Sequence, residues 1–324
     1  QRQGSRFGNV PVLRRIPERI EGQLTTGLEQ RLTDGALSIS KARDYSKLLN
    51  YDKPTRDQFE SEALRRSGTY KEMTRGEILQ LQNEISTNFK DPRQASEMLP
   101  DILRAVRVGM LTGETAKEAQ QGITQLVRAL GIAGRLTDNE GRYQAKETRE
   151  FIDAYLRAKI IGGRDINPRE AYQFIKYGRT TGQTMNGEAL TLGFLAMPDL
   201  RGSSFGNALN QAVKQLTGGA TKQAMANQAR DGLIEGGIEK DTASGRNRFV
   251  YRGVKDEVLL RENPYQWFWQ NFMGQDGVLA KQGVDPLNAK PAEIAKVLSQ
   301  YFSRETANDL ANKIVNQQGE WKTQ

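Results

Sequence analysis

The sequence contains neither cysteine nor histidine among its 324 residues. Without cysteine, disulfides, thiolate zinc sites and cysteine nucleophiles are excluded. Without histidine, the chain lacks the side chain that most often serves as a general base or as a metal ligand. We therefore nominate no catalytic residue, no metal ligand and no cofactor-binding residue, and we expect no cofactor. These absences favour a structural or binding protein over an enzyme.

Long apolar runs are also missing. The longest covers residues 192–197, far below the roughly 20 apolar residues of a transmembrane helix. We therefore expect no membrane span in this segment. The first residue is glutamine rather than methionine, which favours an excerpt or a processed product of a longer protein.

The chain is basic, with 47 Lys and Arg against 39 Asp and Glu and a net charge of +8. This charge favours anionic partners such as nucleic acid, although a solvated basic surface explains it equally well. Arginines can bind phosphates if the fold brings them to one face, and no docking motif for sequence-specific reading accompanies them. The candidate DNA or anion contacts are Arg14, Arg15, Arg19, Arg246, Arg248 and Arg252.

Glycine and proline divide the chain into short segments. Residues 1–56 combine arginine with glycine and proline, which predicts a basic N-terminal connector with one or two helices. In residues 57–236, apolar side chains recur with helical spacing, which predicts a helical domain. Residues 237–324 are expected to form a C-terminal helical subdomain. The segments share no repeat of fixed length, so the sequence does not support a solenoid.

Local signals place some helix starts. Thr74 and Glu77 have the spacing of a capping box. Asn167 and Pro168 have the residue types of an N-cap and a first helical position. Around 238–258 a turn-rich stretch precedes β-favouring residues, so a small hairpin and an irregular connector fit equally well. We predict a mostly α fold of one or more multi-helix globular domains, with a candidate β-hairpin near 238–258.

Three short motifs resemble catalytic signatures. Residues 202–206 read G-x-S-x-G, the form of a nucleophile elbow, but an elbow needs the histidine that this chain lacks, so a turn that caps the following helix is favoured. Ser38 and Lys41 match S-x-x-K without its companion motifs. Glu60 and Ser61 resemble the Glu-Ser pair of lytic transglycosylases, in which a carboxylic acid protonates the glycosidic oxygen. A solvated helical glutamate is the simpler interpretation.

Aromatic residues gather on almost all sides of the segment 265–272. One interpretation is a fully buried helix. The other is a contact surface for another subunit, since aromatic side chains are enriched in interfaces. The candidate protein-interface residues are Tyr265, Trp267 and Trp269.

From about Thr74 onward, several blocks of packing and turn residues follow one another along the chain. They are Ser96-Glu97-Met98-Leu99-Pro100-Asp101-Ile102-Leu103, the run 174–205 with Leu190-Thr191-Leu192, Gly206-Asn207-Ala208-Leu209-Asn210-Gln211, Gly218-Gly219, Glu262-Asn263-Pro264-Tyr265-Gln266-Trp267, Gly283-Val284-Asp285-Pro286 and Ala307-Asn308. In this order the blocks resemble the helical domain of phage tail tape measure proteins, a family also found in prophages.

The resemblance implies a virion protein of the tail lumen, made in the host cytoplasm, that sets tail length, nucleates tube assembly and leaves ahead of DNA during ejection. It implies tail tube and tail tip or baseplate proteins as partners, DNA during ejection, and a homo-oligomer in the tail. The family's length ruler is expected to be a long continuous helix. This chain is punctuated by glycine, so we expect a globular module of a longer protein. The alternatives from other classes are a peptidoglycan-cleaving module like a lytic transglycosylase, and a basic DNA-contacting helical protein.

Overall fold

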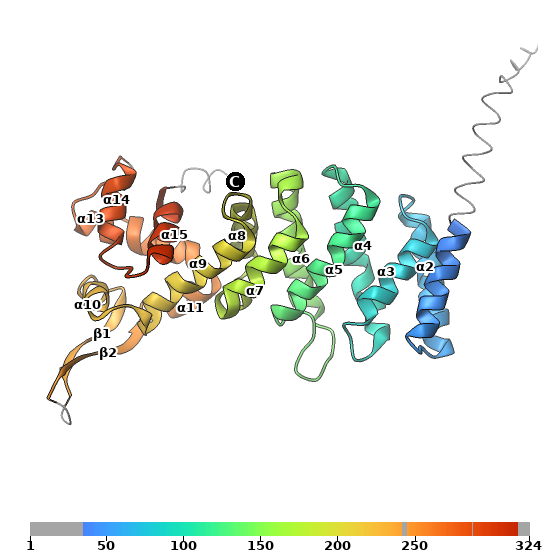
Figure 1. Cartoon of the computed structure of the whole chain (residues 1–324), viewed down its shortest axis with the longest axis horizontal. Coiled ribbons are helices and arrows are strands. Elements are labelled where there is room, and N and C mark those ends of the chain that lie inside the picture. Colours follow the sequence, from blue (N-terminus) through green and yellow to red (C-terminus); the bar gives the residue numbers. More distant parts are fainter. Residues whose placement is uncertain (1–34, 242–244, 287, 317–324) are drawn as a thin grey trace, which may run out of the picture. The chain divides into compact units, whose positions relative to one another are not determined.

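The structure, a computed structural model, describes residues 35–241, 245–286 and 288–316 (Figure 1). About 71% of these residues are helical, and they include one small two-stranded antiparallel sheet. The predicted class, mostly α with a small hairpin, is confirmed. No helix within the described ranges is both long enough and apolar enough to cross a bilayer.

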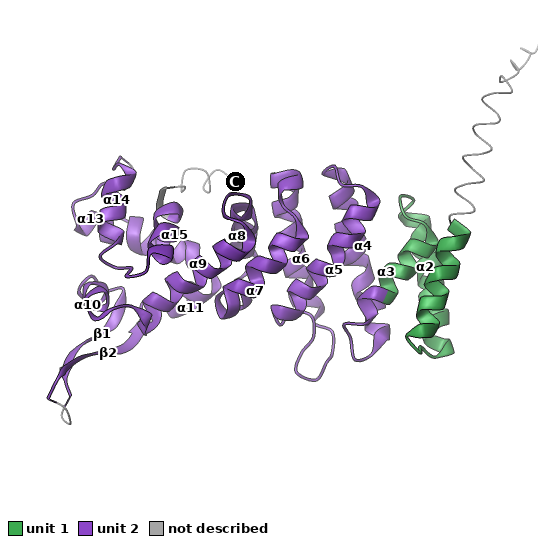
Figure 2. Ribbon diagram, viewed as in Figure 1, with its two compact units in different colours: residues 1–83 green, residues 84–324 purple. Residues whose placement is uncertain are grey.

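The chain divides into two compact units, residues 1–83 and 84–324 (Figure 2). The division falls inside helix α3 (Arg75–Ser86) and differs from the predicted boundaries after residues 56 and 236. Neither predicted boundary interrupts packing. Phe59 and Ala63, just after the first one, are buried in unit 1, and the C-terminal helices pack on the helical stack of unit 2.

Unit 1 consists of a helix over residues 35–48, α2 (Lys53–Thr69) and most of α3. Buried polar groups connect its first and last helices. The Ser46 hydroxyl donates to Asn83 Oδ1 at 3.0 Å, and Asn83 Nδ2 donates to the Ala42 carbonyl at 2.9 Å. The predicted capping box at Thr74 and Glu77 is present, since each side chain accepts a hydrogen bond from the other residue's backbone N–H.

The first part of unit 2 is a stack of helix pairs (Figure 1). In one layer α6 packs on both α4 and α8, and in the other layer α7 packs on both α5 and α9. Helical solenoids stack successive helix pairs in a similar way. The sequence contains no repeat of fixed length, and these pairs accordingly share geometry but no repeated residues. Their bounds are α4 (Ala95–Leu111), α5 (Ala116–Ile132), α6 (Ala145–Gly162), α7 (Pro168–Thr184), α8 (Gly187–Leu200) and α9 (Gly202–Lys214).

The contact between α7 and α9 depends on glycine. A Cβ added to Gly206 would collide with the Phe174 carbonyl oxygen and lie 2.8 Å from the Gly178 nitrogen. A Cβ added to Gly202 would collide with the Glu170 carbonyl oxygen. The Glu170 carboxylate also accepts a hydrogen bond from the Gly202 N–H at 2.6 Å. The G-x-S-x-G motif is therefore the first turn of α9, and its two glycines let the helix backbones approach each other.

Aromatic rings fill the core beside this contact. Phe174 stacks on Phe205 at a centroid distance of 5.5 Å, and Phe205 stacks on Tyr265 at 6.3 Å. A second group of rings follows in the C-terminal part of unit 2, where Phe272 lies 5.7 Å from both Phe268 and Phe302. The stack and the C-terminal segment therefore belong to one unit.

The C-terminal part of unit 2 alternates short helices with the hairpin. Strand β1 pairs with β2 from Ile234 opposite Val254 to Lys240 opposite Asn247, so the hairpin begins four residues before its predicted start at 238. The elements are α10 (Lys222–Arg230), β1 (Ile234–Lys240), β2 (Asn247–Val254), α11 (Glu257–Glu262), α12 (Pro264–Phe268), α13 (Val278–Lys281), α14 (Pro291–Leu298) and α15 (Glu305–Asn316), with π-helical turns at Gln215–Gly219 and Trp269–Met273.

A polar network around Tyr301 fastens the last helices. The Tyr301 hydroxyl donates to the Asp231 carboxylate, and Gln228 Nε2 donates to the Tyr301 carbonyl at 2.7 Å. Burial, together with the hydrogen bond to Asp231, raises the pKa of Tyr301 to about 12. Burial alone would raise the pKa of Asp231, but hydrogen bonds from Arg230 and Tyr301 hold it below its usual value. The network therefore favours a neutral phenol beside an ionised carboxylate.

We predict that Gly206→Ala destabilises unit 2 by about 1–3 kcal/mol, because the added methyl group forces α9 away from α7. The matched control is Gly131→Ala, also within a helix, where a Cβ meets nothing within 4 Å. That variant should be more stable by about 0.5–1 kcal/mol, since alanine loses less backbone entropy on folding. Chemical denaturation of both variants measures the difference. Equal stability would show that the close contact does not constrain the fold.

We predict that Tyr301→Phe lowers the free energy of unfolding by about 1.5–3 kcal/mol at neutral pH, because a hydrogen bond to a charged group is lost. The folded-state pKa of Tyr301 lies above the usual value of 10.0, so its contribution is complete below pH 10 and is lost as the pH rises toward about 12. Stability curves over this pH range should therefore fall less steeply for the variant. Tyr172→Phe, which changes a half-buried ring on α7, should leave the slope unaltered.

Candidate functional site

Glu60 lies on α2 between two arginines. Arg43 donates to both of its carboxylate oxygens, at 2.9 and 2.6 Å, and Arg75 donates to it at 3.0 Å. The hydrogen bond from Arg43 lowers the pKa of Glu60 below its usual value. A general acid of the glycosidase type needs the opposite shift, because it must hold its proton at neutral pH. Ser61 only donates to the Asp57 carbonyl of its own helix.

The S-x-x-K motif lies on the helix 35–48. Ser38 packs against the backbone of α3, so closely that a Cβ on Gly76 would collide with its hydroxyl oxygen. Lys41 is exposed. The two side chains form no hydrogen bond with each other, so the relay that a Ser-Lys site needs is absent from this helix.

The arginines of the hairpin lie among acidic side chains. Arg248 is exposed and stands opposite Glu239 in the register of the sheet. Arg252 forms an ion pair with the same Glu239 and lies at the irregularity opposite Glu235 and Gly236. Arg246 is also exposed. The other three candidate contacts, Arg14, Arg15 and Arg19, lie outside the described residues.

The structure places Tyr265 and Trp267 in the core, with 0% of each exposed. Trp267 Nε1 donates to the Lys255 carbonyl at 2.6 Å. The expected contact surface at these two residues is therefore corrected to core packing, which removes two large rings from water and satisfies the indole N–H. Trp269 is partly buried and donates from Nε1 to the Ile314 carbonyl at 3.3 Å.

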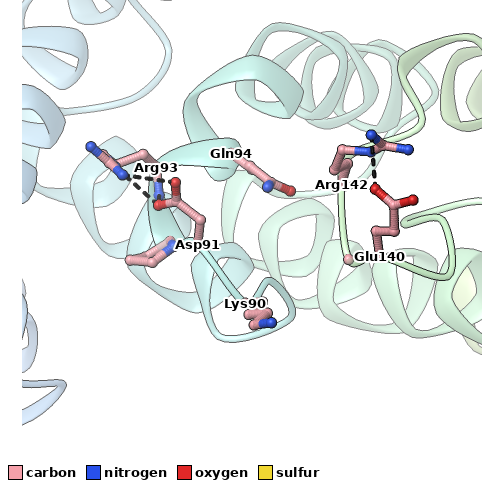
Figure 3. A pocket seen from close by; sticks show the side chains of 8 residues that line it. Lys90, Asp91, Arg93, Gln94, Glu140 and Arg142 are labelled. Atoms are coloured by element: carbon pink, nitrogen blue, oxygen red, sulfur yellow. Dashed lines mark hydrogen bonds and ion pairs between the residues drawn. The ribbon is translucent and has the colours of Figure 1, made fainter.

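A surface groove lies between the loop before α4 and the loop before α6 (Figure 3). Its volume is about 430 Å³. The carboxylates there are already bound, since Arg93 donates to Asp91 at 3.0 Å and Arg142 pairs with Glu140 at 2.8 Å. These internal ion pairs compensate Arg93 and Arg142, and Lys90 is the remaining cation of the lining. No fully buried unpartnered side chain lines this open groove.

Lys159 on α6 is a buried cation, with 1% of its side chain exposed. It donates to Glu114 at 2.6 Å and to the Ile166 carbonyl at 2.7 Å. The lysine therefore joins the turn between α4 and α5 to the residues that precede α7. We interpret it as a structural ion pair, because removing one partner of such a pair would leave an uncompensated buried charge.

The strongest candidate site is a cavity of about 210 Å³ between α7, α9 and α11, which we name the Asn210 pocket. Its walls carry hydroxyl, amide and cationic groups, but no carboxylate lines it. The lining residues are Thr180, Thr181, Thr184, Asn210, Val213, Lys214, Thr217 and Arg261.

Asn210 is the most unusual residue of the pocket. It lies on α9 one turn after Gly206 and is 3% exposed. Its side-chain Nδ2 is buried, and among the described residues no acceptor lies within hydrogen-bonding distance. Leaving such a donor unpaired costs about 1–3 kcal/mol, so a group inside the pocket that accepts its hydrogen bond would stabilise the fold.

Backbone geometry positions the opposite wall. Arg179 has φ 50°, a left-handed value that is rare outside glycine, and it interrupts α7 just before Thr180. Thr184 donates to the Arg261 carbonyl at 2.9 Å, which holds α11 against the end of α7. Sequence reasoning missed this site because its residues come from three separate segments. The one local signal is a polar Asn210 within the most regular apolar helix of the chain.

We predict that neither the native chain nor Glu60→Gln releases peptidoglycan fragments, because an ionised Glu60 cannot act as a general acid. The same change should lower the stability of unit 1 by about 0.5–1 kcal/mol, since Arg43 and Arg75 lose a partly exposed shared carboxylate. Release of labelled peptidoglycan and thermal unfolding measure the two effects. Asp57→Asn, which alters one exposed ion pair on the same helix, is the control. Turnover by the native chain that disappears in Glu60→Gln would contradict this assignment.

Neither a protein-family model nor a curated protein matches this chain, and no solved structure matches its fold. The helix-pair stack is therefore established by the contacts described above. The family resemblance rests on the ordered blocks of residues between 96 and 308.

Proposed function

We propose that this chain is a globular assembly module of a phage tail tape measure protein. The observation that supports the proposal most strongly is the position of the residue blocks that resemble the family. They coincide with helix caps, turns and the glycine contact between α7 and α9. A resemblance concentrated in residues that specify a scaffold favours a structural role.

Three blocks illustrate this coincidence. Leu99, in the block 96–103, is fully buried in α4. Gly206, in the block 206–211, forms the contact with α7. In the block 262–267, Asn263 caps α12 by accepting a hydrogen bond from the Gln266 N–H at 3.1 Å. The three residues therefore have packing, close-contact and capping roles.

The helix-pair stack suits an assembly role. In a stack of helix pairs, the outer surfaces of successive pairs lie side by side and form one extended surface. Proteins built in this way commonly use that surface for binding. Tail tube and tail tip or baseplate proteins are the proposed partners. We further propose a location in the tail lumen, a homo-oligomeric arrangement there, and passage with DNA during ejection.

The proposed module is distinct from a continuous ruler. The longest helix within the described residues is α6, with 18 residues from Ala145 to Gly162. At 1.5 Å per residue such a helix spans about 27 Å, which is a domain dimension. We therefore assign length measurement to helical segments elsewhere in a tape measure protein and assign assembly to this module.

We predict that the chain is found in purified tails by mass spectrometry and that an in-frame deletion of residues 84–324 causes short tails or failed assembly. A deletion removes a whole unit, so point variants sharpen the test. Gly206→Leu should reduce the yield of complete tails, because the bulky side chain separates α7 from α9. Gly131→Ala should leave the yield unchanged. Electron microscopy of tails from each strain provides the measurement.

Absence of the chain from purified particles would overturn the proposal. Normal tails from the strain with the 84–324 deletion would also refute an assembly role for unit 2.

A further inference from the structure

The Asn210 pocket presents hydrogen-bond donors and positive charge. Asn210 Nδ2 is the buried donor, and the hydroxyls of Thr180 and Thr181 on α7 can each donate to a bound oxygen. The Thr184 hydroxyl already donates to the Arg261 carbonyl. Lys214 stands at the exposed side of the pocket. Within the described part of the chain, Lys214 forms no ion pair.

The balance of charge favours an anion. Arg261, the second cation of the pocket, donates to Glu257 at 2.9 Å, and the Glu257 carboxylate is not part of the lining. Lys214 is therefore the cation left to balance a ligand's charge, while Arg261 adds a partly compensated one. A buried amide donor near an unpaired ammonium suits oxygen atoms that carry negative charge, since such hydrogen bonds are stronger than neutral ones.

The size of the pocket agrees with a small group. Its volume of about 210 Å³ exceeds that of one water molecule, whose share of liquid volume is about 30 Å³. The pocket has room for a carboxylate or phosphate group with several oxygens. Such a group can accept hydrogen bonds from α7 and α9 at the same time.

We propose that the Asn210 pocket binds an oxyanion, a carboxylate or phosphate group, between the Asn210 amide and the Lys214 ammonium. The buried unpartnered Nδ2 of Asn210 and the absence of a lining carboxylate carry this inference. It concerns the pocket alone and does not depend on the proposed role in phage tails.

The 324-residue chain is titrated separately with inorganic phosphate and with acetate, at constant ionic strength maintained with sodium chloride. Calorimetry measures the affinity, and the thermal unfolding temperature gives a second readout, because a ligand that binds only the folded state raises it. Saturable binding of phosphate alone assigns the site to phosphate groups. Saturable binding of acetate alone assigns it to carboxylates, and binding of both assigns it to oxyanions generally.

Two variants test the assigned groups. Asn210→Asp replaces the donor with a like charge and should weaken oxyanion binding by about tenfold or more, which corresponds to the loss of a charge-assisted contact. Lys214→Met removes the unpaired cation and should weaken binding severalfold. The controls are Asn207→Asp, an exposed position on the same helix, and Lys296→Met, an exposed lysine on α14. Both controls should bind as the native chain does.

No saturable response to either anion would overturn the proposal. So would equal affinity in the native chain and in Lys214→Met, an exposed substitution that decides the question if Asn210→Asp fails to fold.

Discussion

The close approach of the α7 and α9 backbones is the constraint on which unit 2 depends. Gly202 and Gly206 let α9 lie directly against α7, and this close approach brings Phe205 onto Phe174. One turn later along α9, Asn210 faces the pocket bounded by the end of α7. A wider spacing between the two helices would separate the rings and open the pocket. The lack of a Cβ at Gly202 and Gly206 therefore shapes both the core and the candidate site.

The sequence predicted local structure better than the relations between distant segments. Caps such as Thr74 with Glu77, and Asn167 with Pro168, follow from hydrogen bonds within one turn, and the structure has both. The stack of helix pairs was missed because its pairs agree in geometry while their residues differ. The glycines at 202 and 206 were interpreted as a turn, since their collision partners lie about 30 positions earlier. The Asn210 pocket was missed for the same reason.

Charge explains why Glu60 is poorly suited to act as a general acid. Glu60 resembles a general acid only when its sequence neighbours are considered, whereas Arg43 and Arg75 approach it from other helices and hold it ionised. The groove in Figure 3 repeats this pattern, because each of its acidic side chains has an arginine partner. The Asn210 pocket differs in that its lining contains cations and donors without an acid.

The aromatic core has a consequence for synthesis. Phe205 receives its stacking partner Tyr265 only after another 60 residues have been made, which takes on the order of several seconds at about 5–20 residues per second. Gln228 similarly waits for the Tyr301 carbonyl, 73 positions later. Until Tyr265 has been made, Phe205 lacks a ring that covers it in the folded chain. Nascent copies of the chain made close together would thus be most prone to associate with each other, or with a chaperone, during this interval.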